Sequence, residues 1–278
     1  MPALSVVGLA LLAGCWQGAS APAARSPHAV HYVVEWAVDG IEWTPDHRAW
    51  EVTNDLGYRV RVTRGYLTSY SMELVECPRA TATPPVARNE IFLQQTVMAM
   101  RSIGAALDTA LVGTAHAGHA SGTPNPAAIR PMQIESLLEP RPREVGTVLL
   151  QPQAYCQLHY LAARASGDAR DLPADVDMAD TTLHVEGAYR GPGTTTDTAF
   201  TVHSALANGG LVDHTSDGTP IRVDPGGGAL RVTVRRRLAR IFDGVAFAAM
   251  DERARARQIL QSVIDHLEVT IEAEHATR

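Results

Sequence analysis

The stretch Tyr58–Cys77 reads YRVRVTRGYLTSYSMELVEC and decides the fold class. Tyrosine and valine alternate with arginine and threonine over residues 58–63, and a second alternating run covers Leu67–Val75. The same period of two recurs at residues 31–40, HYVVEWAVDG. Alternation of this kind, with β-branched and aromatic residues on one face, predicts half-buried strands.

Outward from this stretch, further short strands are predicted between turns rich in Gly, Pro and Asp. They cover residues 145–150, 155–163, 181–189, 199–206, 230–238 and 269–271. Many short strands separated by turns are typical of an antiparallel β-sandwich. The sequence therefore predicts a mainly β protein.

Two segments have the apolar spacing of helices, Gln95–Val112 and Asp251–Leu267. The second opens with two acidic residues, which the helix dipole favours there. Residues 115–146 are Pro-rich and are expected to be irregular. We expect a single sandwich domain over residues 30–278, with a helical and Pro-rich insertion at about 85–146 and a C-terminal helix.

The composition limits the possible functions. The chain has 278 residues and a net charge of -6, which disfavours a nucleic-acid partner. All 24 basic residues are arginine, which excludes a P-loop lysine and a Schiff-base lysine. No G-x-S-x-G, H-E-x-x-H or G-x-G-x-x-G motif is present, so we do not expect an enzyme.

The N-terminus carries a targeting pattern. The apolar run Leu4–Gly14 is too short to span a membrane and fits a signal peptide. Its end, Leu12–Cys15, resembles the lipobox of bacterial lipoproteins. The resemblance implies a signal peptide over residues 1–14, lipidation of Cys15 and a tether over residues 15–29. The alternative is an apolar tail with an incidental cysteine.

Lipidation places the chain in the cell envelope, facing the periplasm and held to the membrane by its acyl chains. Trp16 stands where inner-membrane lipoproteins of enteric bacteria carry Asp, which favours the outer membrane. Met1–Ala3 has no basic residue, which leaves room for a start further upstream.

The two other cysteines are Cys77 and Cys156, each at the end of a predicted strand. In the oxidising envelope a disulfide between them is the simplest prediction. Metal thiolates or free buried thiols are the alternatives.

Histidines form the main candidate site. His116 and His119 flank a glycine where the first predicted helix meets the Pro-rich segment, and two imidazoles so spaced can share one ion. A third ligand must come from elsewhere, and we expect it among His159, His184 and His203. The metal would be copper or zinc, since imidazole suits both. The alternative is that these are ordinary surface histidines, some paired with residues such as Glu186 and Glu35.

Two charged clusters have simpler explanations. The first consists of acidic residues that could offer oxygens to Ca²⁺ but are expected to form a solvated loop: Asp168, Asp171, Asp175, Asp177 and Asp180. The second, Arg235–Arg237, could approach anionic lipid, but strand alternation favours one solvated face.

The strand-rich layout and the motif Arg240–Val245, RIFDGV, resemble envelope proteins of the methanobactin-operon P (MbnP-like) class. The resemblance implies a periplasmic, copper-associated β-sandwich, with a metal-uptake or other envelope protein as partner. No ligand of that family is assigned to a position here. The hypotheses are a lipid-anchored protein that binds or delivers a metal and, as the alternative, a structural or interaction lipoprotein.

Overall fold

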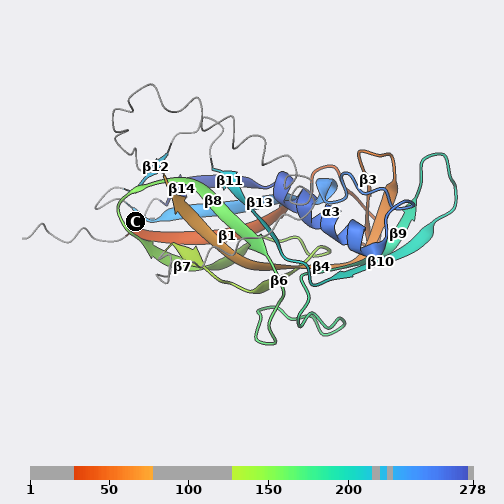
Figure 1. Cartoon of the computed structure of the whole chain (residues 1–278), viewed down its shortest axis with the longest axis horizontal. Helices are drawn as coiled ribbons and strands as arrows, with labels where there is room; N and C mark the ends of the chain where they lie inside the picture. The colour runs from red at the N-terminus through yellow and green to blue at the C-terminus, as the bar shows by residue number, and fades with distance from the viewer. Residues whose placement is uncertain (1–27, 78–126, 215–219, 224–227, 275–278) are drawn as a thin grey trace, which may run out of the picture.

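The structure is a computed structural model that describes residues 28–77, 127–214, 220–223 and 228–274. Its smaller sheet has four strands in the order β14–β13–β1–β7 (Figure 1). Their bounds are β1 His28–Ala37, β7 Arg143–Leu150, β13 Leu230–Arg237 and β14 Glu268–Ala273. β1 and β13 run parallel, whereas the other named strand pairs in the described part of the chain are antiparallel. The sandwich is therefore not purely antiparallel, because β13 enters this sheet between β1 and β14.

The larger sheet has ten strands and is built around β4, Arg59–Glu76. One path across it runs β10–β9–β4–β3–β2, while β5, β6 and β8 also pair with β4, and β11 and β12 pair with β8. The bounds are β2 Glu42–Trp43, β3 Trp50–Thr53, β5 Ala128–Ile129, β6 Gln133–Ser136, β8 Ala154–Ala162, β9 Leu183–Arg190, β10 Thr198–Ser204, β11 Asn208–Asp213 and β12 Ile221–Arg222.

β4 joins two regions of the molecule. The two strands predicted within residues 58–75 are one strand of 18 residues, with register shifts between Val62 and Arg64 and between Ser69 and Ser71. Its first half pairs with β3 and β9, and its second half pairs with β6 and β8. Bulges bend a strand and change its twist, so the two halves of β4 can pair with different sets of strands.

In the first region, called here the sandwich half, the smaller sheet packs on the second half of β4 and on β8. Alternate residues of β1 and β13 point inward, and Tyr32, Val34 and Val232 are fully buried there. One inward residue is charged: Arg236 of β13 lies in the core and forms an ion pair with Glu135 of β6.

In the second region, called here the helix-covered half, the chain after β13 covers the sheet. This cover consists of a 3-10 turn, η1 Leu238–Arg240, the loop over residues 241–250, and α3, Glu252–Asp265 (Figure 1). Asp251 caps α3 by accepting a hydrogen bond from the Ala254 amide, as its position before the helix predicts. Phe242 and Phe247 from the loop pack against Phe200 of β10.

The disulfide prediction is confirmed. Cys77 follows β4, Cys156 lies on the adjacent strand β8, and the two sulfurs are bonded with the Cα atoms 4.9 Å apart. The bond closes a sequence separation of 79 residues at the end of the sandwich half. None of the helices in the described ranges is long and apolar enough to cross a membrane.

The mainly β fold and the C-terminal helix are confirmed, and three local expectations differ. Residues 127–146, expected to be irregular, contain β5, β6 and the start of β7. β1 begins at His28, within the residues assigned to the tether. The strands β2, β3, β11 and β12 had no clear alternating pattern and were not predicted. The predicted signal peptide, Cys15 and the predicted helix at residues 95–112 lie outside the described residues.

Candidate metal-binding site

Two of the predicted histidines lie side by side on the larger sheet. His184 of β9 and His203 of β10 are directly opposite each other in the antiparallel pair. Leu183 and Val185 point into the core, so alternation places His184 on the outer face of the sheet. The Nδ1 atoms of His184 and His203 are 3.3 Å apart, and the ring centroids are 5.6 Å apart at an angle of 75°.

The other nitrogen of His184 contacts a carboxylate. His184 Nε2 lies 3.0 Å from Oε1 of Glu186, two residues further along the same face of β9. A carboxylate only accepts hydrogen bonds, so Nε2 carries the proton and donates it. In the neutral ring, Nδ1 then has a lone pair that faces His203.

The outer nitrogen of His203 contacts a hydroxyl group. His203 Nε2 lies 3.2 Å from Oγ1 of Thr181, and that hydroxyl donates to the carbonyl oxygen of Ala179 at 3.3 Å. When the hydroxyl proton is used in this way, Oγ1 accepts from His203 Nε2, and Nδ1 of His203 also has a lone pair. In that arrangement two lone pairs face each other across 3.3 Å. If the Thr181 hydroxyl donates to His203 Nε2 instead, Nδ1 of His203 carries the proton and donates it to Nδ1 of His184. A cation bound between the two nitrogens would take the place of that proton.

The surroundings leave the pair open on one side. The side chain of His184 is only 9% exposed, whereas His203 is exposed. On the edge strand β10, the backbone amide of His203 donates a hydrogen bond to Oε1 of Glu252, at the start of α3. This part of the strand edge is therefore covered by Glu252. An ion could therefore reach the pair from the His203 side.

A loop over residues 163–182 lies over the outer face of the sheet next to His184. It packs a small second core against β6, in which Ala165, Met178 and Ile134 are buried. Its Asp175 accepts a hydrogen bond from the Tyr66 hydroxyl at 2.9 Å and lies 3.0 Å from Nε of Arg64. This hydrogen bond and Arg64 lower the pKa of Asp175, whereas desolvation and Asp175 raise the pKa of Tyr66 to about 12.

Three other acidic residues of the predicted cluster also have protein partners. Asp171 pairs with Arg143, Asp168 accepts from Ser166, and Asp177 accepts from the Ala179 amide. These contacts fit a structural loop better than a calcium site.

The one other predicted ligand in the described ranges, His159, does not join the pair. His159 lies on β8 opposite Glu73 of β4, and its Nδ1 is 3.5 Å from Oε1 of Glu73. His184 is opposite Tyr66 of β4. Residues 66 and 73 are separated by about 23 Å along the strand, for seven residues at roughly 3.3 Å each. His116 and His119 lie outside the described residues. Within the described ranges, no group of three or more His, Cys, Asp or Glu side chains could hold a metal ion.

Glu186 and Glu35 were predicted to pair with histidines, and only Glu186 does so. His184 does contact Glu186, but Glu35 pairs with Arg235, and His31 instead contacts Thr147 and Glu274. The contact between His184 and His203 was missed, although the turn at Gly191–Gly193 gave a signal. Closing a hairpin around that turn in the observed register brings these two positions opposite each other.

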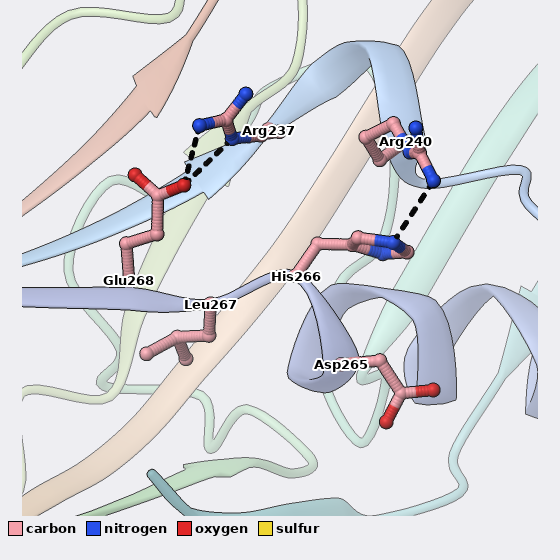
Figure 2. Close-up of a pocket in the computed structure, with 6 residues that line it drawn as sticks. All are labelled: Arg237, Arg240, Asp265, His266, Leu267 and Glu268. Carbon is pink, nitrogen blue, oxygen red and sulfur yellow. Dashed lines mark hydrogen bonds and ion pairs between the residues drawn. The ribbon is translucent and has the colours of Figure 1, made fainter. Parts of the chain in front are cut away.

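A polar hollow of about 310 Å³ lies between the end of β13 and the end of α3 (Figure 2). Arg237 contacts Glu268 there, and Arg240 contacts Asp243 and lies 3.4 Å from Nε2 of His266. Because carboxylates already pair with both guanidinium groups, the hollow has no free positive group for an anion.

Comparison with protein-family models, curated proteins and solved structures finds no match for this chain.

Proposed function

We propose that this chain is a non-enzymatic lipoprotein of the cell envelope that binds a transition metal ion, copper or zinc, with His184 and His203 as two of the ligands. The carrying observation is the 3.3 Å separation of their Nδ1 atoms. Two nitrogens bound to one tetrahedral ion at about 2.0–2.1 Å lie about 3.3 Å apart. The pair thus already has the spacing of two adjacent ligands.

The site has the further features that an exchangeable ion requires. One ring is buried and held by its neighbours, and the other is exposed, so binding needs little rearrangement and leaves a path for the ion. Water or an incoming group would complete the coordination, as in zinc sites that keep an open position. Imidazole suits both Cu²⁺ and Zn²⁺.

The compartment belongs to the same proposal. The disulfide between Cys77 and Cys156 is of the kind that persists in oxidising compartments, and the lipobox-like end at Cys15 supplies an anchor there. Membrane attachment is tested separately: Cys15→Ala should abolish labelling by a radioactive fatty acid, and equal labelling of the variant would contradict it.

Metal binding is tested with untagged protein that starts at residue 16 and is titrated calorimetrically with Cu²⁺ and with Zn²⁺. His203→Ala removes an exposed ligand and should weaken binding at least tenfold without changing the melting temperature. His159→Ala is the matched control, because His159 lies on the same sheet away from the His184–His203 pair and contacts Glu73. Unchanged affinity in His203→Ala would favour the alternative, an interaction lipoprotein.

The prediction for His116 and His119 needs its own variant. The double change His116→Ala, His119→Ala should also weaken binding at least tenfold if these residues complete the coordination. A loss in His203→Ala without a loss in the double variant would assign the ion to the sheet pair and remove His116 and His119 from the site.

A further inference from the structure

Glu186 lies between the candidate ligand His184 and an arginine. Its Oε1 is 3.0 Å from His184 Nε2, and its Oε2 accepts a hydrogen bond from Nη1 of Arg64 at 2.9 Å. Arg64 in turn contacts Asp175, which accepts from Tyr66. A continuous chain of polar contacts therefore leads from the loop over residues 163–182 to the ring of His184.

This chain contributes little as a stability device. The side chains of Glu186, Arg64 and Asp175 are 33%, 40% and 48% exposed. Ion pairs at such exposed positions have small net effects on folding, because water and salt screen them. Their fixed geometry is better explained by what they do to His184.

Glu186 is also badly placed to bind the ion itself. It contacts Nε2, which lies on the far side of the imidazole ring from Nδ1, the atom that faces His203. Carboxylates in this position orient metal-bound histidines and select the tautomer, and their loss commonly lowers metal affinity 10–100-fold.

We propose that Glu186 is the positioning residue of the site: it holds the proton of His184 on Nε2 and so keeps Nδ1 free for a metal ion, with Arg64 fixing the orientation of its carboxylate. The proposal rests on the proposed function for the role of the site. The effect on the tautomer can be measured without metal.

Replacing Glu186 by glutamine should reverse the tautomer. A guanidinium group only donates hydrogen bonds, so Arg64 will bind the amide oxygen of the glutamine. The amide NH2 then faces His184 and donates to Nε2. The ring proton must move to Nδ1, where it occupies the position of the ion.

The test uses Glu186→Gln in the untagged protein that starts at residue 16, with Glu73→Gln as the matched control. Glu73 lies 3.5 Å from Nδ1 of His159, and His159 lies apart from the His184–His203 pair. Long-range ¹H–¹⁵N spectra of the metal-free proteins at about pH 8.5, where imidazole is neutral, report which ring nitrogen carries the proton. We expect the Nε2–H form of His184 in the wild type and the Nδ1–H form in Glu186→Gln. Affinity for Zn²⁺ should fall at least tenfold in Glu186→Gln and stay unchanged in Glu73→Gln.

A second variant separates positioning from loss of charge. In Glu186→Gln with Arg64→Ala, nothing fixes the amide oxygen, so the glutamine can turn it toward Nε2 and accept the proton again. Zn²⁺ affinity should then recover relative to Glu186→Gln alone, although the site has lost a further partner. No recovery would show that the charge of Glu186, and not its orientation, acts on the site.

The possible failures can be told apart. If the wild type binds Zn²⁺ and Glu186→Gln keeps both the tautomer and the affinity, the positioning role is wrong and the metal site stands. If the tautomer changes as expected but the wild type binds neither Zn²⁺ nor Cu²⁺, the positioning role stands and the proposed function is wrong.

Discussion

The sandwich half and the helix-covered half solve the same problem by different chemistry. The large sheet must bury its inner face in both, and β4 runs through both. In the sandwich half the partner is a second sheet, and the core contains a buried ion pair. In the helix-covered half the partner is a loop and a helix, and the core is a cluster of aromatic rings.

In the sandwich half, a few buried polar contacts determine how the two sheets pack on each other. Arg236 is fully buried and donates to both carboxylate oxygens of Glu135, at 2.7 and 2.5 Å, and to Ser69 and Tyr160. Its guanidinium carbon lies 4.3 Å from the ring centre of Trp36, a cation–π contact. These partners come from both sheets, so the network fixes how the sheets lie on each other.

The helix-covered half depends on the shape of its rings and on side-chain hydrogen bonds to the covering loop, of which those of Asn54 are buried. Phe200, Phe242 and Phe247 are mutually in contact, with centroids 4.9 to 6.2 Å apart. Asn54 links the covering loop to the sheet by donating to the carbonyl oxygens of Phe242 and Val245, each at 3.0 Å. The comparison predicts that the two halves respond differently to loss of a polar group.

The largest effect is expected in the sandwich half. Arg236→Met leaves Glu135 buried without its partner and should lower the free energy of unfolding by about 4 kcal/mol, measured by urea denaturation. Adding Glu135→Leu to the same protein removes the uncompensated charge and should restore most of the loss. A double variant as unstable as Arg236→Met would show that the ion pair itself, and not the cost of an unpaired charge, holds the sheets together.

A smaller effect is expected from Asn54→Ala in the helix-covered half. It leaves two buried carbonyl groups without their donor and should cost about 2 kcal/mol of unfolding free energy. Asp55→Ala is the control: Asp55 is the exposed neighbour that accepts from the Gly244 amide at 2.7 Å, and its loss should cost well under 1 kcal/mol. Equal losses in the two variants would mean that burial does not explain the role of Asn54.

The arginines of β13 show how much of this core could be predicted from the sequence. Alternation correctly placed β13 and predicted a solvated face for Arg235 and Arg237, which pair with Glu35 and Glu268. It could not indicate that Arg236, between them, is buried, because its partner Glu135 is 101 residues away in a segment expected to be irregular. The buried pair depends on tertiary contacts that a strand pattern does not contain.

The candidate site shows the same limit. The sequence supplied His184 and His203 as separate candidates, with the turn-forming residues Gly191–Gly193 between them. The register that places them opposite each other is set by the inward face of the hairpin, where Val185 pairs with Val202. The disulfide was easier to predict, since two cysteines in a chain predicted to be exported have few alternatives.

The smallest effect concerns a carboxylate on the outer face of the helix-covered half. Glu51 of β3 accepts hydrogen bonds from Nε of Arg59 and Nε of Arg61, each at 2.6 Å. Desolvation acts to raise the pKa of Glu51, but the two arginines outweigh it and hold the pKa below its ordinary value of 4.5. A lowered pKa in the folded state stabilises the protein above the pKa of the unfolded state, and this contribution is lost as the pH falls through the folded-state value.

Glu51→Gln should therefore cost about 1 kcal/mol at pH 7, a modest value because both arginines are half exposed and screened by water. The difference from the wild type should shrink as the pH falls below 4.5 and should be lost once Glu51 is protonated in the folded protein. Glu42→Gln is the control, since Glu42 is 84% exposed and 3.9 Å from Arg59. Chemical denaturation from pH 3 to pH 7 measures both variants. If the loss of unfolding free energy in Glu51→Gln stays constant over this range, the side chain of Glu51 acts through its shape and not its charge. The ion pairs with Arg59 and Arg61 would then contribute nothing to stability on this face.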